Sequence, residues 1–298
     1  MAPKFPKTPK LIEPYRIEHG KKFRLKDFDP ADTQGLDLKD KAKEFLEDGI
    51  KRLSDMQQKL YAQDRWALLI ILQGMDSAGK DSVIRHVMSG LNPQSCQVYA
   101  FKKPSQEDLS HDFLWRASQL LPKRGEIGIF NRSYYEEALI VRVHPALLRE
   151  ERIPQSLISK KIWKERFDDI ITFERYLARN GTLVRKVFLN VSKEAQRRRF
   201  LARLDEPDKN WKFSEDDVRE REHWDDYMRA YEDMICHTAA PHAPWFVVPA
   251  DHKWFTRVVV ASIVIEALES LKLAYPRVDA AKKTELESAR KLLVDEIR

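Results

Sequence analysis

Apolar runs alternate with amphipathic stretches along this chain, which is typical of strands that alternate with helices. Runs that resemble buried strands occupy residues 67–72, 98–101, 126–130, 183–191 and 245–248. Stretches with a helical pattern occupy residues 38–61, 82–88, 104–121, 158–178 and 253–271. This alternation predicts an α/β fold with a parallel sheet covered by helices on both faces.

The two ends of the chain show a different pattern. Residues 1–35 are rich in proline and lysine and keep no sustained period, so we expect an extended arm that lies over the domain or is partly disordered. Residues 276–298 are charged and helix-prone, which indicates a C-terminal helix, a tail or a contact between subunits. Residues 36–275 are expected to form one domain, and no internal repeat divides them.

The composition describes a soluble globular protein with a heavily charged surface. Hydrophobic residues make up 43% and charged residues 34% of the 298 positions. The net charge of +6 suggests a polyanionic partner such as nucleic acid, an anionic membrane or a long phosphate chain. A basic protein without such a partner fits the composition equally well.

The cysteines and the hydropathy of the chain indicate where in the cell the protein acts. Cys96 and Cys236 are the two cysteines, and they lie too far apart in sequence to indicate a disulfide framework or a zinc site. No apolar signal-peptide core follows the N-terminus. The most apolar window, residues 258–268, is too short to span a bilayer and is interrupted by Glu266. We therefore expect a cytoplasmic protein that makes no membrane contact.

The strand at 67–72 runs into a glycine-containing loop with the spacing of a phosphate-binding loop, or Walker A motif. The loop consists of Gly74, Met75, Asp76, Ser77, Ala78, Gly79, Lys80 and Asp81. Its backbone N–H groups and the following helix N-terminus would hold an anion, and Lys80 would supply a mobile positive charge. The alternative is a plain glycine-bearing turn between strand and helix.

Two carboxylates distinguish this loop from the standard motif. Asp81 stands where a hydroxyl normally holds magnesium, and it could act through a water or stabilise the helix N-terminus. Asp76 would repel bound phosphates unless a cation lay between them, so we expect it to bind magnesium.

A second group of polar residues follows the strand at 126–130. Asn131 and Arg132 stand at its carboxyl end, where open α/β sheets bind ligands. An arginine there can bridge phosphate oxygens and stabilise charge during phosphoryl transfer. The alternative is a surface arginine paired with Glu136 or Glu137.

A basic segment around residues 196–213 has the composition of a mobile lid over a phosphate site. Arg199 and Arg203 are four residues apart and share one helical face. The segment then becomes polar, includes Pro207 and returns to a helical pattern, so we place the lid at about residues 203–223. Considered alone, the charge run favours a solvated helix.

The histidines and tryptophans argue against two other functions. His86, His111, His144 and His223 show no metal-ligand spacing and no pairing with a nucleophile. Trp163, Trp224 and Trp245 are not interleaved with a basic stripe, as binders of single-stranded nucleic acid require. We therefore expect no nucleic-acid partner.

Five motifs together resemble the polyphosphate kinase 2 family, in order and over approximately residues 15–275. They lie at residues 74–81, 112–116, 131–137, 203–213 and 243–249. The resemblance implies a thymidylate-kinase-like P-loop fold with a helical lid. It also implies magnesium-assisted (or manganese-assisted), direct in-line transfer of a terminal phosphoryl group between inorganic polyphosphate and a nucleotide. Family members form dimers or tetramers, so the resemblance implies a homo-oligomer.

The same resemblance implies roles for individual residues. Asp76, Lys80 and Arg132 would be catalytic, and Asp76 would be the metal ligand. The lid side of the polyphosphate channel would be lined by Arg199, Arg203, Lys209 and Lys212. Many members have Asp-Arg at the second motif, so Asn131 leaves a second magnesium ligand open.

The second motif is similar to that of the class III subgroup, whose members accept both nucleoside mono- and diphosphates. Asn131, Glu136 and Glu137 would then face the acceptor nucleotide. An ATP-dependent nucleoside monophosphate kinase on the same fold is the nearest rival function. A non-catalytic module that binds polyphosphate or nucleotides is another.

Overall fold

A computed structural model describes residues 8–210 and 215–296 of the chain. A six-stranded sheet forms its centre, in the order β1-β6-β5-β2-β4-β3. The strands are β1 (Arg16–Ile17), β2 (Ala67–Gln73), β3 (Cys96–Ala100), β4 (Ile127–Asn131), β5 (Thr182–Asn190) and β6 (Trp245–Pro249). Neighbours from β6 to β3 pair in parallel, and β1 pairs antiparallel with β6. The predicted parallel α/β sheet is thus confirmed.

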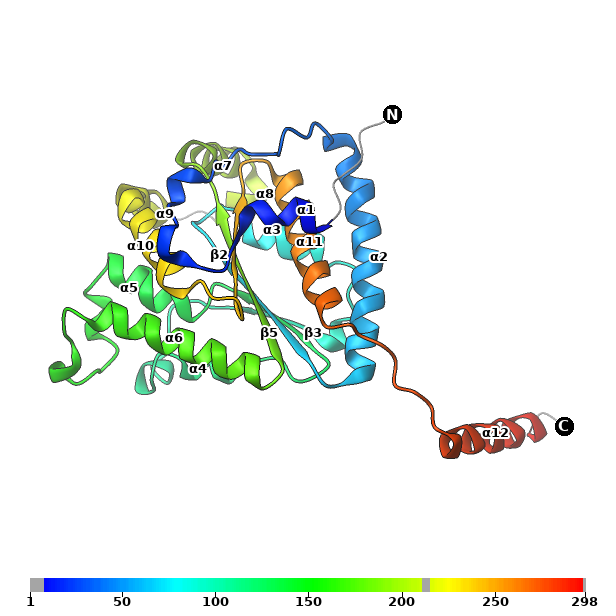
Figure 1. The fold of residues 1–298 in the computed structure, drawn as a ribbon. Helices are drawn as coiled ribbons and strands as arrows, with labels where there is room; N and C mark the ends of the chain where they lie inside the picture. Colours follow the sequence, from blue (N-terminus) through cyan, green and yellow to red (C-terminus); the bar gives the residue numbers. More distant parts are fainter. Residues whose placement is uncertain (1–7, 211–214, 297–298) are drawn as a thin grey trace.

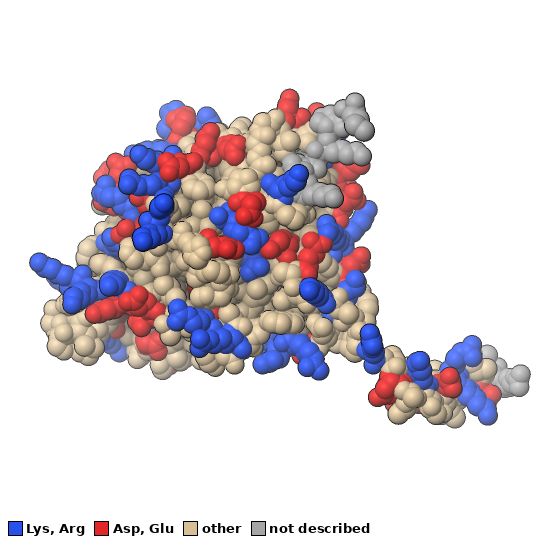
Figure 2. Space-filling view, viewed as in Figure 1, with Lys and Arg blue, Asp and Glu red and all other residues tan. Residues whose placement is uncertain are grey.

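Helices cover both faces of the sheet (Figure 1). One face carries α2 (Lys39–Gln63), α3 (Lys80–Val87) and α11 (Lys253–Ser270). The other carries α4 (Trp115–Ser118), α5 (Ile140–Val143), α6 (Ile162–Arg179) and α10 (Trp224–Thr238). Charged side chains of both signs are scattered among uncharged residues on the face that Figure 2 shows. No helix in the described ranges is long and apolar enough to cross a lipid bilayer.

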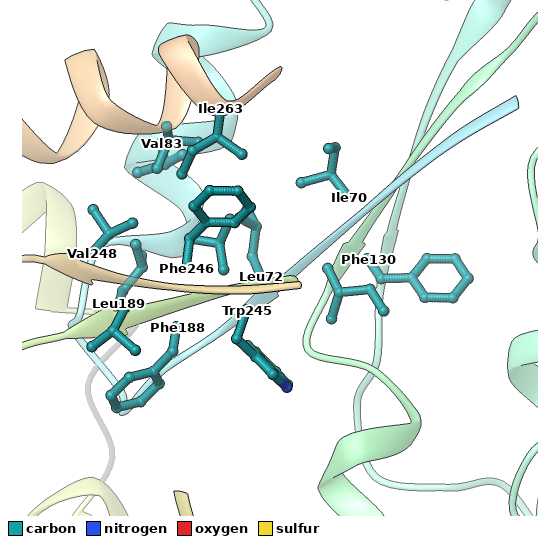
Figure 3. Close-up of a cluster of buried hydrophobic side chains, with 14 of the residues drawn as sticks. Ile70, Leu72, Val83, Phe130, Phe188, Leu189, Trp245, Phe246, Val248 and Ile263 are labelled. Carbon is teal, nitrogen blue, oxygen red and sulfur yellow. The ribbon is translucent and has the colours of Figure 1, made fainter. Parts of the chain in front are cut away.

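The core lies where the central strands meet the helices. All seven residues of β2 are buried, because both faces of this strand are covered. Figure 3 shows Leu72, Leu189 and Phe246 from three strands beside Val83 of α3 and Ile263 of α11. Continuous apolar strands of this kind leave polar groups to the strand ends, which is where the candidate site lies.

A fully buried ion pair lies on the α6 side of the sheet. Lys186 of β5 and Glu174 of α6 are both 0% exposed, and the Lys186 ammonium donates to the Glu174 carboxylate at 2.6 Å. The hydroxyls of Tyr134 and Tyr135 donate to the other carboxylate oxygen at 2.9 and 2.8 Å, and Lys186 also donates to the Thr238 carbonyl. The pair therefore ties the chain after β4 to α6, β5 and α10.

Short elements form the two ends of the chain and the region after β5. α1 (Thr8–Ile12) packs on α11, and its Leu11 and Ile12 are fully buried. After β5 come α7 (Lys193–Asp205), α8 (Pro207–Asn210) and α9 (Glu215–Arg219). The last helix, α12 (Ala280–Asp295), stands away from the domain at the end of an extended linker (Figure 1).

Two expectations from the sequence were wrong. The helix expected at 104–121 is mostly loop, with α4 as its only α-helical turn. Ser105 and Asp108 hydrogen-bond to each other through side chains and backbone, which stabilises a turn in place of a helix. The helix expected from residue 158 begins at Ile162 instead, after a short turn of 3-10 helix.

Candidate functional site

The loop after β2 has the backbone geometry of an anion cradle. Gly74 has a φ of +151°, and a side chain there would place its Cβ 2.9 Å from the Leu189 carbonyl oxygen. Ser77 adopts a φ of +60°, and α3 begins at Lys80 directly after the loop. The loop is therefore held by conformations that favour glycine or strain other residues, as expected at a functional site.

Lys80 folds back onto its own loop. Its ammonium donates to the carbonyls of Gly74 at 2.6 Å and Met75 at 3.2 Å, and only 8% of the residue is exposed. Burial lowers the pKa of Lys80 to about 8, with a further contribution from Arg132, while Asp76 opposes the shift. The ammonium is therefore poorly solvated, and a phosphate anion would be a favourable partner for it.

Asp76 and Arg132 face each other across the ends of β2 and β4. The Arg132 guanidinium donates to the Asp76 carboxylate at 2.5 Å and lies 3.8 Å from the Glu136 carboxylate. Burial favours a higher pKa for Asp76, but Lys80 and Arg132 hold it below the ordinary value. Arg132 has a φ of +64°, a strained conformation for a residue other than glycine. The sequence motifs thus meet in one polar cluster.

Side chains of helix α7 hydrogen-bond to the phosphate loop. Gln196 donates to the Asp76 carbonyl at 2.9 Å, and Arg199 donates to the carbonyls of Ser77 at 2.8 Å and Ala78 at 2.9 Å. Arg203 donates to the Ser77 hydroxyl at 2.7 Å.

Sequence reasoning missed Gln196. Its spacing of three and seven residues from Arg199 and Arg203 on one helical face could have indicated it. Arg199 is also tied to the carbonyls of Ala250 and Asp251. Burial lowers the pKa of this guanidinium. Arg199 thus holds the loop backbone in shape, whereas Arg203 contacts the loop through the Ser77 hydroxyl.

A cavity of about 280 Å³ opens beside Arg132. Charged residues of both signs line it: Lys102, Lys103, Arg116, Arg132, Glu136, Glu137, Glu150 and Glu151. Apolar residues complete the wall: Phe101, Leu109, Ile140, Val141 and Leu147. Its mixture of apolar surface and a few charged groups is typical of small-molecule sites.

Glu137 lines this cavity and is only 5% exposed. Arg116 donates to its carboxylate at 2.9 Å, and Arg166 donates to its backbone carbonyl at 2.6 Å. Burial raises the pKa of Glu137 to about 7, and Arg116 opposes the shift. Arg116 and Arg166 were not assigned a role from the sequence, because only the fold brings them to Glu137.

The carboxylates of the site fit a metal ion held mainly by substrate. No group of three or more His, Cys, Asp or Glu side chains in the described residues is arranged to hold a metal. Asn131 donates to the Asp81 carboxylate at 2.8 Å, so Asp81 is tied to the second motif. Asp76 has a side chain that is 37% exposed beside the loop. Mg²⁺ commonly uses one or two carboxylates together with phosphate oxygens, which this arrangement can provide.

The remaining candidates lie elsewhere. The side chain of Lys209 and all of Lys212 lie outside the described residues. His144 and His223 come together with their rings 4.9 Å apart, although they are remote in sequence. His144 contacts the Glu220 carboxylate at 3.0 Å at the end of the predicted lid. Trp224 and Trp245 are buried, in agreement with a packing role.

Comparison with known proteins identifies the family. The model of a family described as polyphosphate kinase 2 matches residues 36–275. The ADP-polyphosphate phosphotransferase of Rhodopseudomonas palustris is 49% identical over 281 residues, which cover 94% of this chain and 97% of that protein. The AMP/ADP-polyphosphate phosphotransferase of Meiothermus ruber is 40% identical over 273 residues, covering 91% and 98%.

Solved structures agree with this assignment. The crystal structure of polyphosphate kinase 2 from Arthrobacter aurescens TC1 matches with a TM-score of 0.87 at 39% identity, covering 99% of each chain. The chain therefore belongs to the polyphosphate kinase 2 family, and the resemblance seen in its motifs is confirmed.

Proposed function

We propose that this protein transfers a terminal phosphoryl group between inorganic polyphosphate and a nucleoside mono- or diphosphate. The observation that carries the proposal is the meeting of Lys80, Asp76 and Arg132 at one sheet edge, beside a cavity of about 280 Å³ lined by apolar and charged groups. The names of the two relatives, which act on polyphosphate with ADP or with AMP and ADP, support it.

The site divides into a donor side and an acceptor side. The phosphate loop and the basic lid form the donor side, where Lys80 and Arg203 would bind polyphosphate oxygens. Lys209 and Lys212 belong to the same proposal by their place in the sequence. The cavity with Asn131, Glu136 and Glu137 nearby would take the acceptor nucleotide.

The reaction needs positioning and charge stabilisation more than a protein nucleophile. The bond between the terminal phosphorus and its bridging oxygen breaks, and a bond from that phosphorus to an acceptor phosphate oxygen forms. Arg132 lies between the loop and the cavity, where it can contact the group in transfer. Bound Mg²⁺ or Mn²⁺ at Asp76 would neutralise phosphate charge.

Three properties complete the proposal. We infer that Mg²⁺ is the natural metal, that the protein is a homo-oligomer and that it acts in the cytoplasm. The two cysteines remain free thiols in the structure, which suits a reducing compartment. Light scattering of the purified protein tests the oligomeric state.

The decisive experiment mixes purified protein, Mg²⁺, polyphosphate and either AMP or ADP, and measures ADP and ATP. We expect product with both acceptors, and no product with either would refute the proposal. Arg132→Ala should lower turnover by about 10²–10³, the usual cost of losing one preorganised charge donor. Asp76→Asn should lose activity with its far-ultraviolet circular dichroism unchanged.

The rival functions give different outcomes in the same assay. An ATP-dependent nucleoside monophosphate kinase would convert ATP and AMP to ADP but would leave polyphosphate and ADP unreacted. A non-catalytic binding module would bind polyphosphate after Lys80→Ala and would turn over neither pair.

A further inference from the structure

The edge of the sheet opposite the phosphate loop carries a second feature. Three turns meet there, because parallel strands share their amino ends: residues 64–66 before β2, 123–125 before β4 and 180–181 before β5. Backbone bonds join them, from Gly125 N to the Trp66 carbonyl at 2.8 Å and from Ala67 N to the Gly181 carbonyl at 2.9 Å. The seven-residue strand β2 separates them from Gly74, a span of about 20 Å.

Aromatic rings are exposed on this edge. Tyr61 and Tyr176 are 61% and 62% exposed, and Trp66 is 36% exposed. Tyr61 lies in the last turn of α2 with its backbone beside Gly125, and the Trp66 ring lies beside Gly181. Asn180 donates its amide to the Tyr176 carbonyl and so places the last turns of α6 at the same edge. A single exposed ring is normal on a protein surface, but a group of rings at one edge favours a binding role.

Cations surround these rings. Arg65, Lys123, Arg124, Arg175 and Arg179 are all exposed here. Asp64 and Glu126 are the nearby acids, so the edge has an excess of positive charge. Arg124 bonds to the carbonyls of Arg65 and Asn180 and links two of the turns. Figure 2 shows Lys and Arg gathered along the lower margin of the domain, on the side where α6 ends in Figure 1.

The exposed rings and cations of this edge favour one kind of binding partner over others. An identical copy would place like charges opposite one another in a two-fold contact, which is unfavourable. Inorganic polyphosphate would satisfy the cations but offers no flat apolar group for the rings. Single-stranded nucleic acid offers both phosphates and stacking bases, and arginine suits it better than lysine because its planar group also stacks.

We propose that this edge, defined by Tyr61, Trp66, Tyr176, Arg124, Arg175 and Arg179, binds single-stranded nucleic acid at a site separate from the catalytic one. The three tryptophans considered in the sequence lie elsewhere, and Trp66 reaches this surface only through the fold. Bases stack on the rings and phosphates contact the arginines, without sequence preference.

The test is fluorescence anisotropy of a labelled single-stranded RNA of about 15 nucleotides, repeated with DNA of the same sequence and with its duplex. We expect binding of both single strands, weaker binding of the duplex, and affinity that falls steeply with salt. Lys80→Ala should bind RNA like the wild type, which separates this proposal from the proposed phosphotransfer. No RNA binding at low salt would overturn the inference.

Matched variants test the two parts of the surface. Tyr176→Ala should weaken RNA binding about tenfold, whereas Tyr176→Phe should retain it, because the ring and not the hydroxyl stacks. Each of the variants Arg175→Ala and Arg179→Ala should lose about one phosphate contact, so the slope of log affinity against log salt should fall by about one. The control variant Arg290→Ala, on α12, should leave that slope unchanged. All five variants should keep wild-type phosphotransfer rates.

Two results would contradict the assignment of partner. Unchanged RNA affinity in Tyr176→Ala would show that stacking is absent and that the edge attracts any polyanion. A change in molecular mass in the same variant, measured by light scattering, would show instead that the rings join two copies of the chain.

Discussion

Glu174→Gln tests the buried ion pair beneath the sheet. The substitution keeps the size of the side chain and an oxygen that can accept from Tyr134 and Tyr135, but it removes the negative charge beside Lys186. Burial lowers the pKa of Lys186, and Glu174 opposes that shift. Without the carboxylate, the ammonium is left unpaired in the core, and we expect it to lose its proton.

The loss of unfolding free energy in Glu174→Gln can be worked out in two ways. Removing one partner of a buried pair typically costs about 3–5 kcal/mol. Deprotonating a lysine costs about 1.4 kcal/mol for each unit by which the pH lies below its pKa. For an ordinary pKa near 10.4 and a pH of about 7, the cost is about 5 kcal/mol. The two agree because both describe the same buried charge. We therefore expect the free energy of unfolding to fall by about 3–5 kcal/mol near neutral pH.

The pH dependence has a defined sign. In the variant, Lys186 is neutral in the folded protein. In the unfolded chain it carries a proton at any pH below the ordinary lysine pKa. Stability therefore rises with pH by about 1.4 kcal/mol per unit, so the deficit should shrink by about 3 kcal/mol between about pH 7 and pH 9. In the wild type the carboxylate keeps the ammonium charged, so this gain should be absent at neutral pH.

Guanidinium denaturation followed by tryptophan fluorescence provides the assay, since Trp245 lies 5.2 Å from the Lys186 ammonium. The double variant Glu174→Gln/Lys186→Met removes both charges and should recover most of the loss. A deficit below about 1 kcal/mol, or one that does not change with pH, would refute the reasoning.

Four further predictions concern the loop and its supports. The pKa of Lys80 is lowered to about 8, so the KM for polyphosphate should rise as pH increases through that value and the ammonium loses its charge; a flat KM from about pH 7 to 9 would contradict this. Arg199→Ala should lower turnover about tenfold or more by loosening the loop, measured against Arg197→Ala, an exposed arginine on the same helix that should be neutral. Ser192→Ala removes the N-cap bond of α7 and should lower the free energy of unfolding by about 1 kcal/mol in denaturant titration. Gly181→Ala should lower it by about 1–3 kcal/mol, because φ is +85° and its Cβ would lie 3.2 Å from a backbone oxygen; a neutral effect would show that the turn relaxes.

Local patterns were sufficient for much of the fold. The continuous apolar runs at β2 and β6 predicted buried parallel strands, because a strand covered on both faces admits few polar residues. The glycine-containing loop between β2 and α3 was predictable from its glycine and lysine spacing. Where side chains compete with the helix backbone, as at residues 105–108, the same reasoning failed.

The sequence by itself therefore determined the elements, the loop and the family motifs, since these depend on residues close together in the chain. The tertiary structure alone decided which distant groups meet. It places Gln196 and Arg199 on the loop, Arg116 on Glu137, and Lys186 on Glu174. Such contacts depend on the register and packing of whole elements, and periodicity in sequence can place residues on one helical face but cannot say what that face contacts.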